Sequence, residues 1–182
     1  NIIVCADGTW NRPEEDLEED HPSNVLRLAR AITPEQGGQR QHVFYDWGLG
    51  SYHSKLSAGA TGRGIHKNIV DGYRYIVQNY HPGDRIYLFG FSRGAYTVRA
   101  LSGLINNCGI LKRADAPLIA EAWKIYKSPV ARNSPSGANA VAFRQRHAHS
   151  TRNVHFVGVW DSLQFNGAAR QSRRVLRYQN GR

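Results

Sequence analysis

Short apolar runs alternate with amphipathic stretches along the chain. Runs bounded by turn residues predict strands at residues 2–6, 42–46, 85–90 and 154–160. Between them, apolar side chains recur every three or four positions, which predicts helices from Ser23 to about Ile32 and over residues 65–80, 93–107 and 115–125. This alternation is typical of an α/β fold, in which a mostly parallel sheet carries helices on both faces.

One motif stands at the carboxyl end of a predicted strand, which is where sites form in such folds. Gly90-Phe-Ser-Arg-Gly94 is a G-x-S-x-G pattern between the strand 85–90 and the helix that follows it. A sharp turn there raises the Ser92 hydroxyl above the sheet edge, and glycine at positions 90 and 94 lets other backbone pass close by. The pattern predicts a nucleophile elbow with Ser92 as the nucleophile; an ordinary tight turn is the alternative.

The same turn predicts an oxyanion hole. The first turn of a helix presents N–H groups and a partial positive charge to a negatively charged oxygen. We therefore expect the Arg93 N–H to be one donor. The second donor should come from another loop at the strand ends, and Gly8 and Thr9, which follow the first strand, are the candidates.

A serine triad also needs an acid and a histidine later in the chain. Asp161 follows the strand 154–160 and is the candidate acid, unless it only opens a turn. No histidine lies between Asp161 and the last of the 182 residues. Histidines that precede or lie on the strand 154–160 fall at its far end. Those near the carboxyl edge are His21, His53 and His66, of which His53 is the best substitute base.

Five sequence blocks carry a family resemblance: 7–11, 45–50, 62–80, 82–101 and 158–162. They resemble the uncharacterised α/β-hydrolase domain family that includes the catalytic domain of type VI secretion phospholipase effectors. The Gly-Phe-Ser-Arg-Gly-Ala block is the most specific of them. The resemblance implies an α/β-hydrolase fold and ester hydrolysis, with phospholipids as one substrate class. It also implies that Ser92 is the nucleophile and Asp161 the triad acid.

In that family the domain continues past the Gly-Val-Trp-Asp block, and its histidine comes from there. From Leu163 onward we recognise no such pattern in this sequence. We therefore expect an α/β-hydrolase domain over residues 1–162 that is truncated at its carboxyl end, with esterase turnover near background. Residues 163–182 hold five arginines and no acid, so we expect a basic, disordered tail.

The charge is concentrated in the last third of the chain. Residues 1–121 hold 13 basic and 13 acidic side chains, whereas residues 122–182 hold 11 basic and one acidic, which accounts for the net charge of +10. Such a region attracts anionic membrane surfaces and other polyanions. It has no recognised nucleic-acid fold and few aromatic residues, so we expect no specific recognition of nucleic acid.

Several other classes of protein are disfavoured. Residues 59–64 resemble a phosphate-binding loop, but no strand directly precedes them and no Lys-Ser/Thr follows. The acidic run 14–20 lacks the spacing of a calcium loop. No apolar run reaches the ~18 residues of a membrane span, and no signal-peptide pattern opens the chain. We expect no metal, no cofactor and no transmembrane segment, and a location in the cytoplasm or secretion without a signal peptide.

Residues 112–153 separate the elbow helix from the last predicted strand. They are interpreted either as a lid, with Trp123 and Phe143 as apolar contacts, or as a plain surface excursion. Cys5 and Cys108 lie in apolar stretches and are expected to be buried free thiols. Two function classes stay open: a serine hydrolase that acts on an ester of a lipid, and a non-catalytic interaction module or pseudoenzyme on the same fold.

Overall fold

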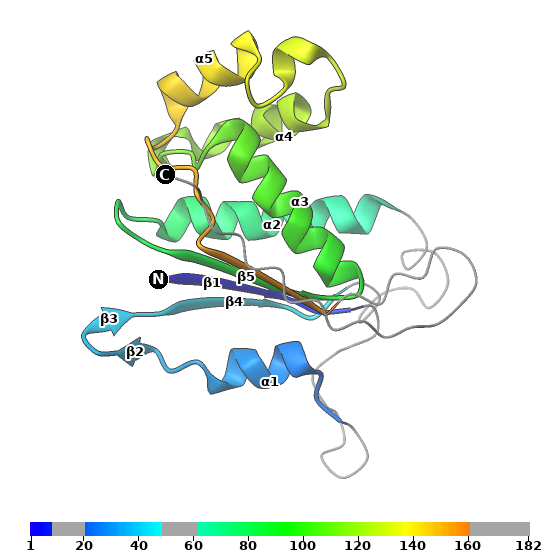
Figure 1. Ribbon diagram of the computed structural model, residues 1–182, viewed down its shortest axis with the longest axis vertical. Helices are drawn as coiled ribbons and strands as arrows, with labels where there is room; N and C mark the ends of the chain where they lie inside the picture. Colours follow the sequence, from blue (N-terminus) through cyan, green and yellow to red (C-terminus); the bar gives the residue numbers. More distant parts are fainter. Residues whose placement is uncertain (9–20, 49–61, 161–182) are drawn as a thin grey trace.

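A computed structural model describes residues 1–8, 21–48 and 62–160 (Figure 1). The strands are β1 (Ile2–Ala6), β2 (Glu35–Gln36), β3 (Gln39–Arg40), β4 (His42–Asp46), β5 (Ile86–Phe91) and β6 (Phe156–Trp160). The α-helices are α1 (Asn24–Ala31), α2 (Gly62–Asn79), α3 (Arg93–Cys108), α4 (Ile119–Lys127) and α5 (Ala138–His147). Two short 3₁₀ helices are η1 (Arg113–Leu118) and η2 (Ala131–Asn133). The predicted tail and the domain boundary at residue 162 lie outside the described residues.

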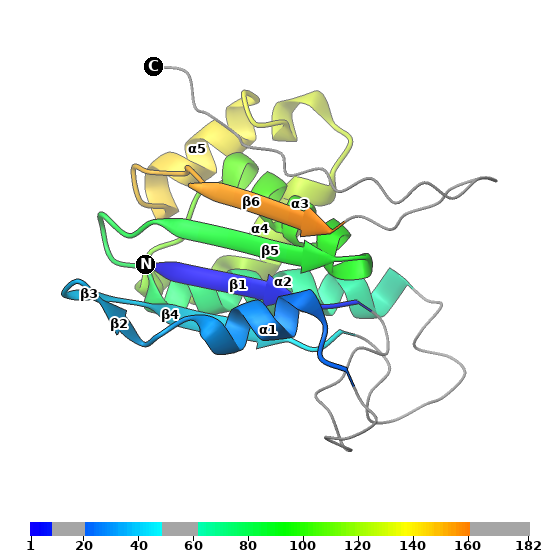
Figure 2. The same cartoon turned by 60° about the horizontal axis from the view of Figure 1, so that its bottom comes forward.

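Four strands form one parallel sheet in the order β4-β1-β5-β6. At the carboxyl end of β1, Ala6 lies beside Asp46 of β4 and Gly90 of β5. Phe91, the last residue of β5, lies beside Trp160, the last residue of β6. The carboxyl ends of the four strands therefore meet at one edge of the sheet, as the arrowheads in Figure 2 show.

Helices cover both faces of the sheet, which confirms the predicted α/β fold. α2 and α3 pack on one face and α1 on the other (Figure 1). Along β1, Ile2, Val4 and Ala6 join the core beneath α2 and α3, whereas Ile3 and Cys5 join the core beneath α1. Because both faces of β1 are buried, the strand is apolar at every position and shows no alternation.

The prediction for the cysteines is also confirmed. Cys5 and Cys108 are both buried and free. Burial raises the pKa of each thiol to about 12. Both side chains are therefore protonated at neutral pH and contribute packing rather than reactivity.

The structure differs from the sequence predictions in the less patterned stretches. Residues 35–40 form a β2–β3 hairpin that turns at Gly37 and Gly38, and its two-residue strands are too short to show alternation. Helix α5 forms in a stretch whose sequence is mostly polar. Only Ala140 and Phe143 of its residues are buried, so no clear apolar stripe marks the helix. The helix predicted over residues 115–125 begins as η1 and becomes α-helical at Ile119.

Residues 112–153 form a layer over α3, here called the α4–α5 layer. Phe143 is buried in the same core as α2 and α3. Trp123 packs half-buried against that core, and its ring centroid lies 5.2 Å from that of His66 on α2. The two aromatic residues named as apolar contacts in the lid interpretation thus attach this layer to the rest of the domain.

The first turn of α3 lies directly on the backbone of β1. A Cβ atom on Gly94 would lie 2.0 Å from the Ala6 carbonyl oxygen and 2.7 Å from that of Asp7. These distances are far inside van der Waals contact, and the atoms concerned are backbone atoms. Glycine is therefore required at position 94 for the helix to approach the sheet this closely.

We expect the Gly94→Ala variant to lose about 3 kcal/mol or more of its free energy of unfolding, because α3 must move away from β1. Denaturant unfolding measures this loss. Gly72→Ala is a matched control on α2, since the atoms nearest to its Cβ are the side-chain ends of Leu101 at 3.2 Å and Val4 at 3.8 Å. We expect that variant to stay within about 1 kcal/mol of the parent protein. Equal losses in the two variants would contradict this account.

Candidate active site

Ser92 alone connects β5 to α3. Its backbone angles are φ 54° and ψ −118°, and it is the one non-glycine with positive φ in the described ranges. A side chain in such a conformation costs about 1–3 kcal/mol, which the surrounding structure must offset. Strain of this kind clusters at functional sites.

Backbone hydrogen bonds hold the Ser92 turn in place. The Ser92 N–H donates to the carbonyl of Trp160, the last residue of β6, at 3.0 Å. The Ser92 carbonyl accepts from the Ala95 N–H, also at 3.0 Å. The hydrogen bonds of α3 therefore begin at Ala95, and Arg93 is the first residue of the helix.

Three loops meet at Ser92, and each has a glycine at the contact. Within the turn between β5 and α3, a Cβ on Gly90 would lie 2.3 Å from the Gly94 carbonyl oxygen. In the loop after β1, a Cβ on Gly8 would lie 3.3 Å from the Ser92 Cβ. In the loop after β4, Gly48 has φ 80°, and a Cβ there would lie 2.1 Å from the Gly8 carbonyl oxygen. The predicted elbow glycines thus lie at a place where backbone meets backbone.

A buried carboxylate, that of Asp7, lies behind this meeting point. Asp7 is 2% exposed and accepts hydrogen bonds from the Gly8 N–H at 2.8 Å and from the Tyr45 hydroxyl at 2.9 Å. The Ser23 hydroxyl also donates to it. Ser23 is in turn the N-cap of α1, where its Oγ accepts from the Leu26 N–H at 3.0 Å. Asp7 therefore joins the ends of β1 and β4 to the start of α1.

The end of β4 supports the same loops. The Asp46 backbone carbonyl accepts from the Asp7 N–H at 2.8 Å, and its side-chain Oδ1 accepts from the Gly48 N–H at 3.1 Å. Burial raises the pKa of Asp46. Burial likewise raises the pKa of Tyr45, and its hydrogen bond to Asp7 raises that pKa further. Sequence reasoning did not identify Asp7, Tyr45 or Gly48 as site residues, although all three lie in blocks of the family resemblance.

The Gly8 hydrogen bond bears on the predicted oxyanion hole. The Gly8 N–H is engaged by the Asp7 carboxylate, so the described contact of Gly8 with Ser92 is one of close packing. Thr9, the other candidate for the second donor, lies outside the described residues. Asp161, which follows Trp160 in the chain, and His53 also lie outside them.

The histidines expected at the far edge of the sheet lie there. The His155 N–H donates to the Ile86 carbonyl at the amino end of β5, and its ring centroid lies 5.1 Å from that of Tyr87. His147 Nδ1 lies 3.0 Å from a carboxylate oxygen of Asp115 in the α4–α5 layer. These contacts place both rings away from the Ser92 turn.

Two of the histidines expected near the carboxyl edge are described. His21 is exposed and lies two residues before Ser23. His66 packs against Trp123. Within residues 21–48 and 62–160, no histidine hydrogen-bonds to Ser92.

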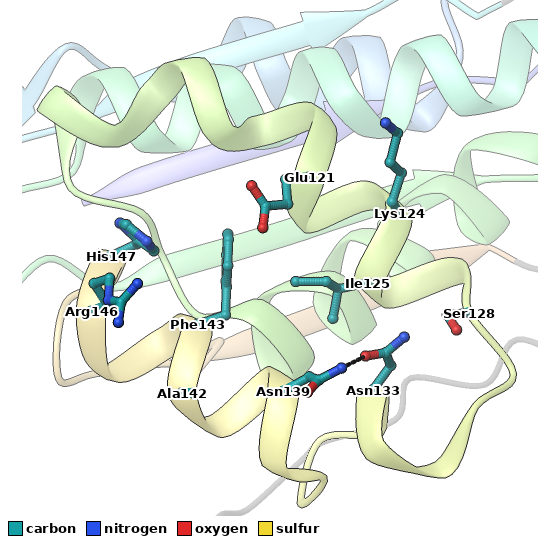
Figure 3. A pocket seen from close by; sticks show the side chains of 10 residues that line it. All are labelled: Glu121, Lys124, Ile125, Ser128, Asn133, Asn139, Ala142, Phe143, Arg146 and His147. Carbon is teal, nitrogen blue, oxygen red and sulfur yellow. Dashed lines mark hydrogen bonds between the residues drawn. The ribbon is translucent and has the colours of Figure 1, made fainter.

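A hollow of about 510 Å³ lies between α4 and α5 (Figure 3). Glu121 and Lys124 line it from α4, and Arg146 and His147 line it from α5. Phe143 points into it between the two helices. No residue of the loops around Ser92 lines this hollow.

The parallel sheet, with a strained serine between a central strand and its helix, defines an α/β-hydrolase-like domain. The chain belongs to the family described as T6SS phospholipase effector Tle1-like, catalytic domain, whose model matches residues 1–180. This finding confirms the resemblance stated above. The match extends beyond residue 162, where the blocks that carried the resemblance end.

One curated relative is the uncharacterized protein YEL023C of Saccharomyces cerevisiae. It is 28% identical to this chain over 193 residues, which cover 93% of this chain and 27% of that protein. The chain thus spans about a quarter of the length of the curated relative. No solved structure matches the chain significantly. Among the described helices, none is long and apolar enough to cross a bilayer.

We expect the Ser92→Gly variant to gain about 1 kcal/mol in free energy of unfolding over Ser92→Ala, because glycine removes the Cβ that makes this backbone conformation costly. Both variants lack the hydroxyl, so their difference isolates the Cβ. Paired urea unfolding curves measure it. At an unstrained position glycine would instead be the less stable of the two, and that result would count against strain at Ser92.

Removing the Tyr45 hydroxyl should weaken the loops around Ser92. Since this hydroxyl donates to a buried carboxylate, we expect Tyr45→Phe to cost about 1.5–3 kcal/mol of stability. Tyr75→Phe is the matched control, because the Tyr75 hydroxyl donates to a neutral acceptor, the Val43 carbonyl, at 3.3 Å. That loss should be about 1 kcal/mol or less. Thermal unfolding of both variants tests the ranking, and a reversed order would refute the role given to Asp7.

Proposed function

We propose that this chain carries the nucleophile of a lipid-ester hydrolase, and that Ser92 attacks the ester carbonyl of a phospholipid. One observation carries the proposal: Ser92 is held at positive φ at the carboxyl edge of a parallel sheet, in a chain of a family described as the catalytic domain of phospholipase effectors. A serine raised above a strand end in this way is accessible to an ester from the loop side of the sheet.

The proposed chemistry is acyl transfer in two stages. Ser92 Oγ forms a bond to the ester carbonyl carbon while a general base removes its proton. The resulting oxyanion is stabilised by the Arg93 N–H at the start of α3 and by the Thr9 N–H in the loop after β1. The C–O bond to the alcohol part of the lipid then breaks, with the proton returning to that oxygen. Water hydrolyses the acyl-serine in a second stage.

The acid of the proposed triad is Asp161. It directly follows Trp160, whose carbonyl accepts the hydrogen bond from the Ser92 N–H, so the end of β6 supports this assignment. A carboxylate there would orient a histidine and stabilise its protonated form. His53 is the candidate base within the 182 residues.

A non-catalytic interaction module on the same fold is the second candidate function. The observation that favours it is that no histidine in the described ranges hydrogen-bonds to Ser92. Without a base, a serine hydroxyl keeps its proton at neutral pH and is a poor nucleophile. The remaining groups of a triad enzyme then give only about 10³–10⁴-fold acceleration over water.

Fluorophosphonate labelling followed by peptide mass analysis tests the nucleophile. A parent protein in which Ser92 takes no label would favour the interaction module. We expect one labelled residue, Ser92, with slow labelling and with p-nitrophenyl ester turnover near background. Ser92→Ala should abolish the label, whereas Ser102→Ala, a serine further along α3, should keep it. Labelling that survives Ser92→Ala would sink the assignment of the nucleophile. Brisk turnover that is lost in His53→Ala would show instead that the triad is complete in this chain.

A further inference from the structure

We propose that the carboxyl end of α4 and the loop that follows it form a docking surface for membranes rich in anionic phospholipid. This surface, called the α4 tip, consists of Lys124, Lys127, Val130 and Arg132. The inference rests on the proposed lipid substrate, and it names the surface that brings a membrane to the Ser92 edge of the sheet.

The charge of the α4–α5 layer supports an anionic partner. Residues 112–153 hold eight basic and two acidic side chains. Of the two acids, Asp115 already pairs with His147 at 3.0 Å. The three cations of the α4 tip are exposed, and none of them forms an ion pair with the described residues. Their charge is therefore available to an anionic surface.

An exposed apolar residue lies between these cations. Val130 is 47% exposed and follows the exposed Pro129 in the loop between α4 and η2. Lys127 and Arg132 flank it at three and two residues' distance. An apolar side chain set between basic ones is typical of interfacial binding, in which the apolar group enters the acyl boundary while the cations contact phosphate.

The α4 tip lies toward the same end of the molecule as Ser92. The loop after α4 extends toward the end where the strand arrowheads and the start of α3 lie, in both views (Figures 1 and 2). Contacts of α4 agree with this placement, because Trp123 packs on His66, in the first turns of α2. Lys127 in turn lies with its Nζ 5.7 Å from the centroid of the Trp123 ring. A membrane bound at the α4 tip would thus lie beside the carboxyl edge of the sheet.

The two charged residues of α4 beside the hollow point in different directions. The Glu121 carboxylate points into it, whereas the Lys124 side chain points out of it (Figure 3). The Lys124 charge is therefore directed to the outer face of α4. We therefore expect lipid phosphate to contact the outer face of α4, where Lys124 and Lys127 are three residues apart.

Vesicle co-sedimentation tests the proposal. The vesicles are made of ether-linked phosphatidylcholine, with and without ether-linked phosphatidylglycerol. They offer a membrane surface that lacks the ester bonds which the proposed hydrolase would cleave. We expect binding to the anionic vesicles that weakens as salt is raised. The triple variant Lys124→Glu, Lys127→Glu, Arg132→Glu should lower the partition coefficient by about 100-fold or more, since each cation contributes roughly fivefold. Val130→Asp should weaken binding, and Val130→Trp should strengthen it.

The matched control is a triple variant of exposed cations outside the α4–α5 layer: Arg27→Glu, Arg40→Glu and Arg85→Glu. It changes the net charge by the same amount. Equal weakening by the two triple variants would overturn the docking surface, because net charge would then explain the binding. Full binding by the α4-tip triple variant would overturn it as well. So would binding to single-stranded RNA that is as tight as binding to vesicles and indifferent to Val130→Asp, which would mark a general polyanion surface.

Failure of this proposal is distinguishable from failure of the proposed function. The α4-tip triple variant should keep the fluorophosphonate label on Ser92, because that probe is small and binds no membrane. Loss of vesicle binding with the label retained is the expected result. Vesicle binding that persists in the parent protein while Ser92 never labels would refute the hydrolase and leave the docking surface standing.

Discussion

The fold depends on backbone meeting backbone at the carboxyl edge of the sheet. The first turn of α3, the loop after β1 and the loop after β4 come together there, and each contact occurs where a side chain would not fit. Glycine at positions 48, 90 and 94 permits this approach, whereas a Cβ on Gly8 would meet the side chains of Phe91 and Ser92. Because the helix and loops are pressed together, the turn at Ser92 has no room to relax to an ordinary conformation. The strain at Ser92 is thus a product of packing that involves three separate segments.

The Asp7 carboxylate makes that packing specific. A buried charge is costly unless it is fully hydrogen-bonded, and Asp7 accepts bonds from Gly8, Ser23 and Tyr45. Moving any one of these donors would remove a hydrogen bond from the buried carboxylate. Asp7 and Gly8 are consequently held in one position beside Ser92. The proposed second donor to the oxyanion, Thr9, comes next in the chain, and a backbone donor that is held in place needs no reorganisation during a reaction.

The local pattern of apolar and polar residues was sufficient to predict the strands and helices that line the core. The strand 2–6 was predicted with its observed bounds, and the Ser23 cap marked the start of α1 correctly. Helix α5 was missed because it buries only two residues and has no clear stripe. Gly90 and Gly94 were identified because they lie within one five-residue motif. The part played by Asp7 was not, because its partners Ser23 and Tyr45 are 16 and 38 residues away, and no local pattern records such contacts.

The strand order has a consequence for how the chain is made. β1 is a central strand, and its neighbour β5 is synthesised long after it, since Ile2 pairs with Ile86. At typical rates of translation, that interval is on the order of ten seconds. During it, an apolar strand that is buried on both faces in the folded state has no partner on one side. Nascent β1 therefore remains without this partner until β5 is made, and an exposed apolar strand of this kind is prone to aggregate.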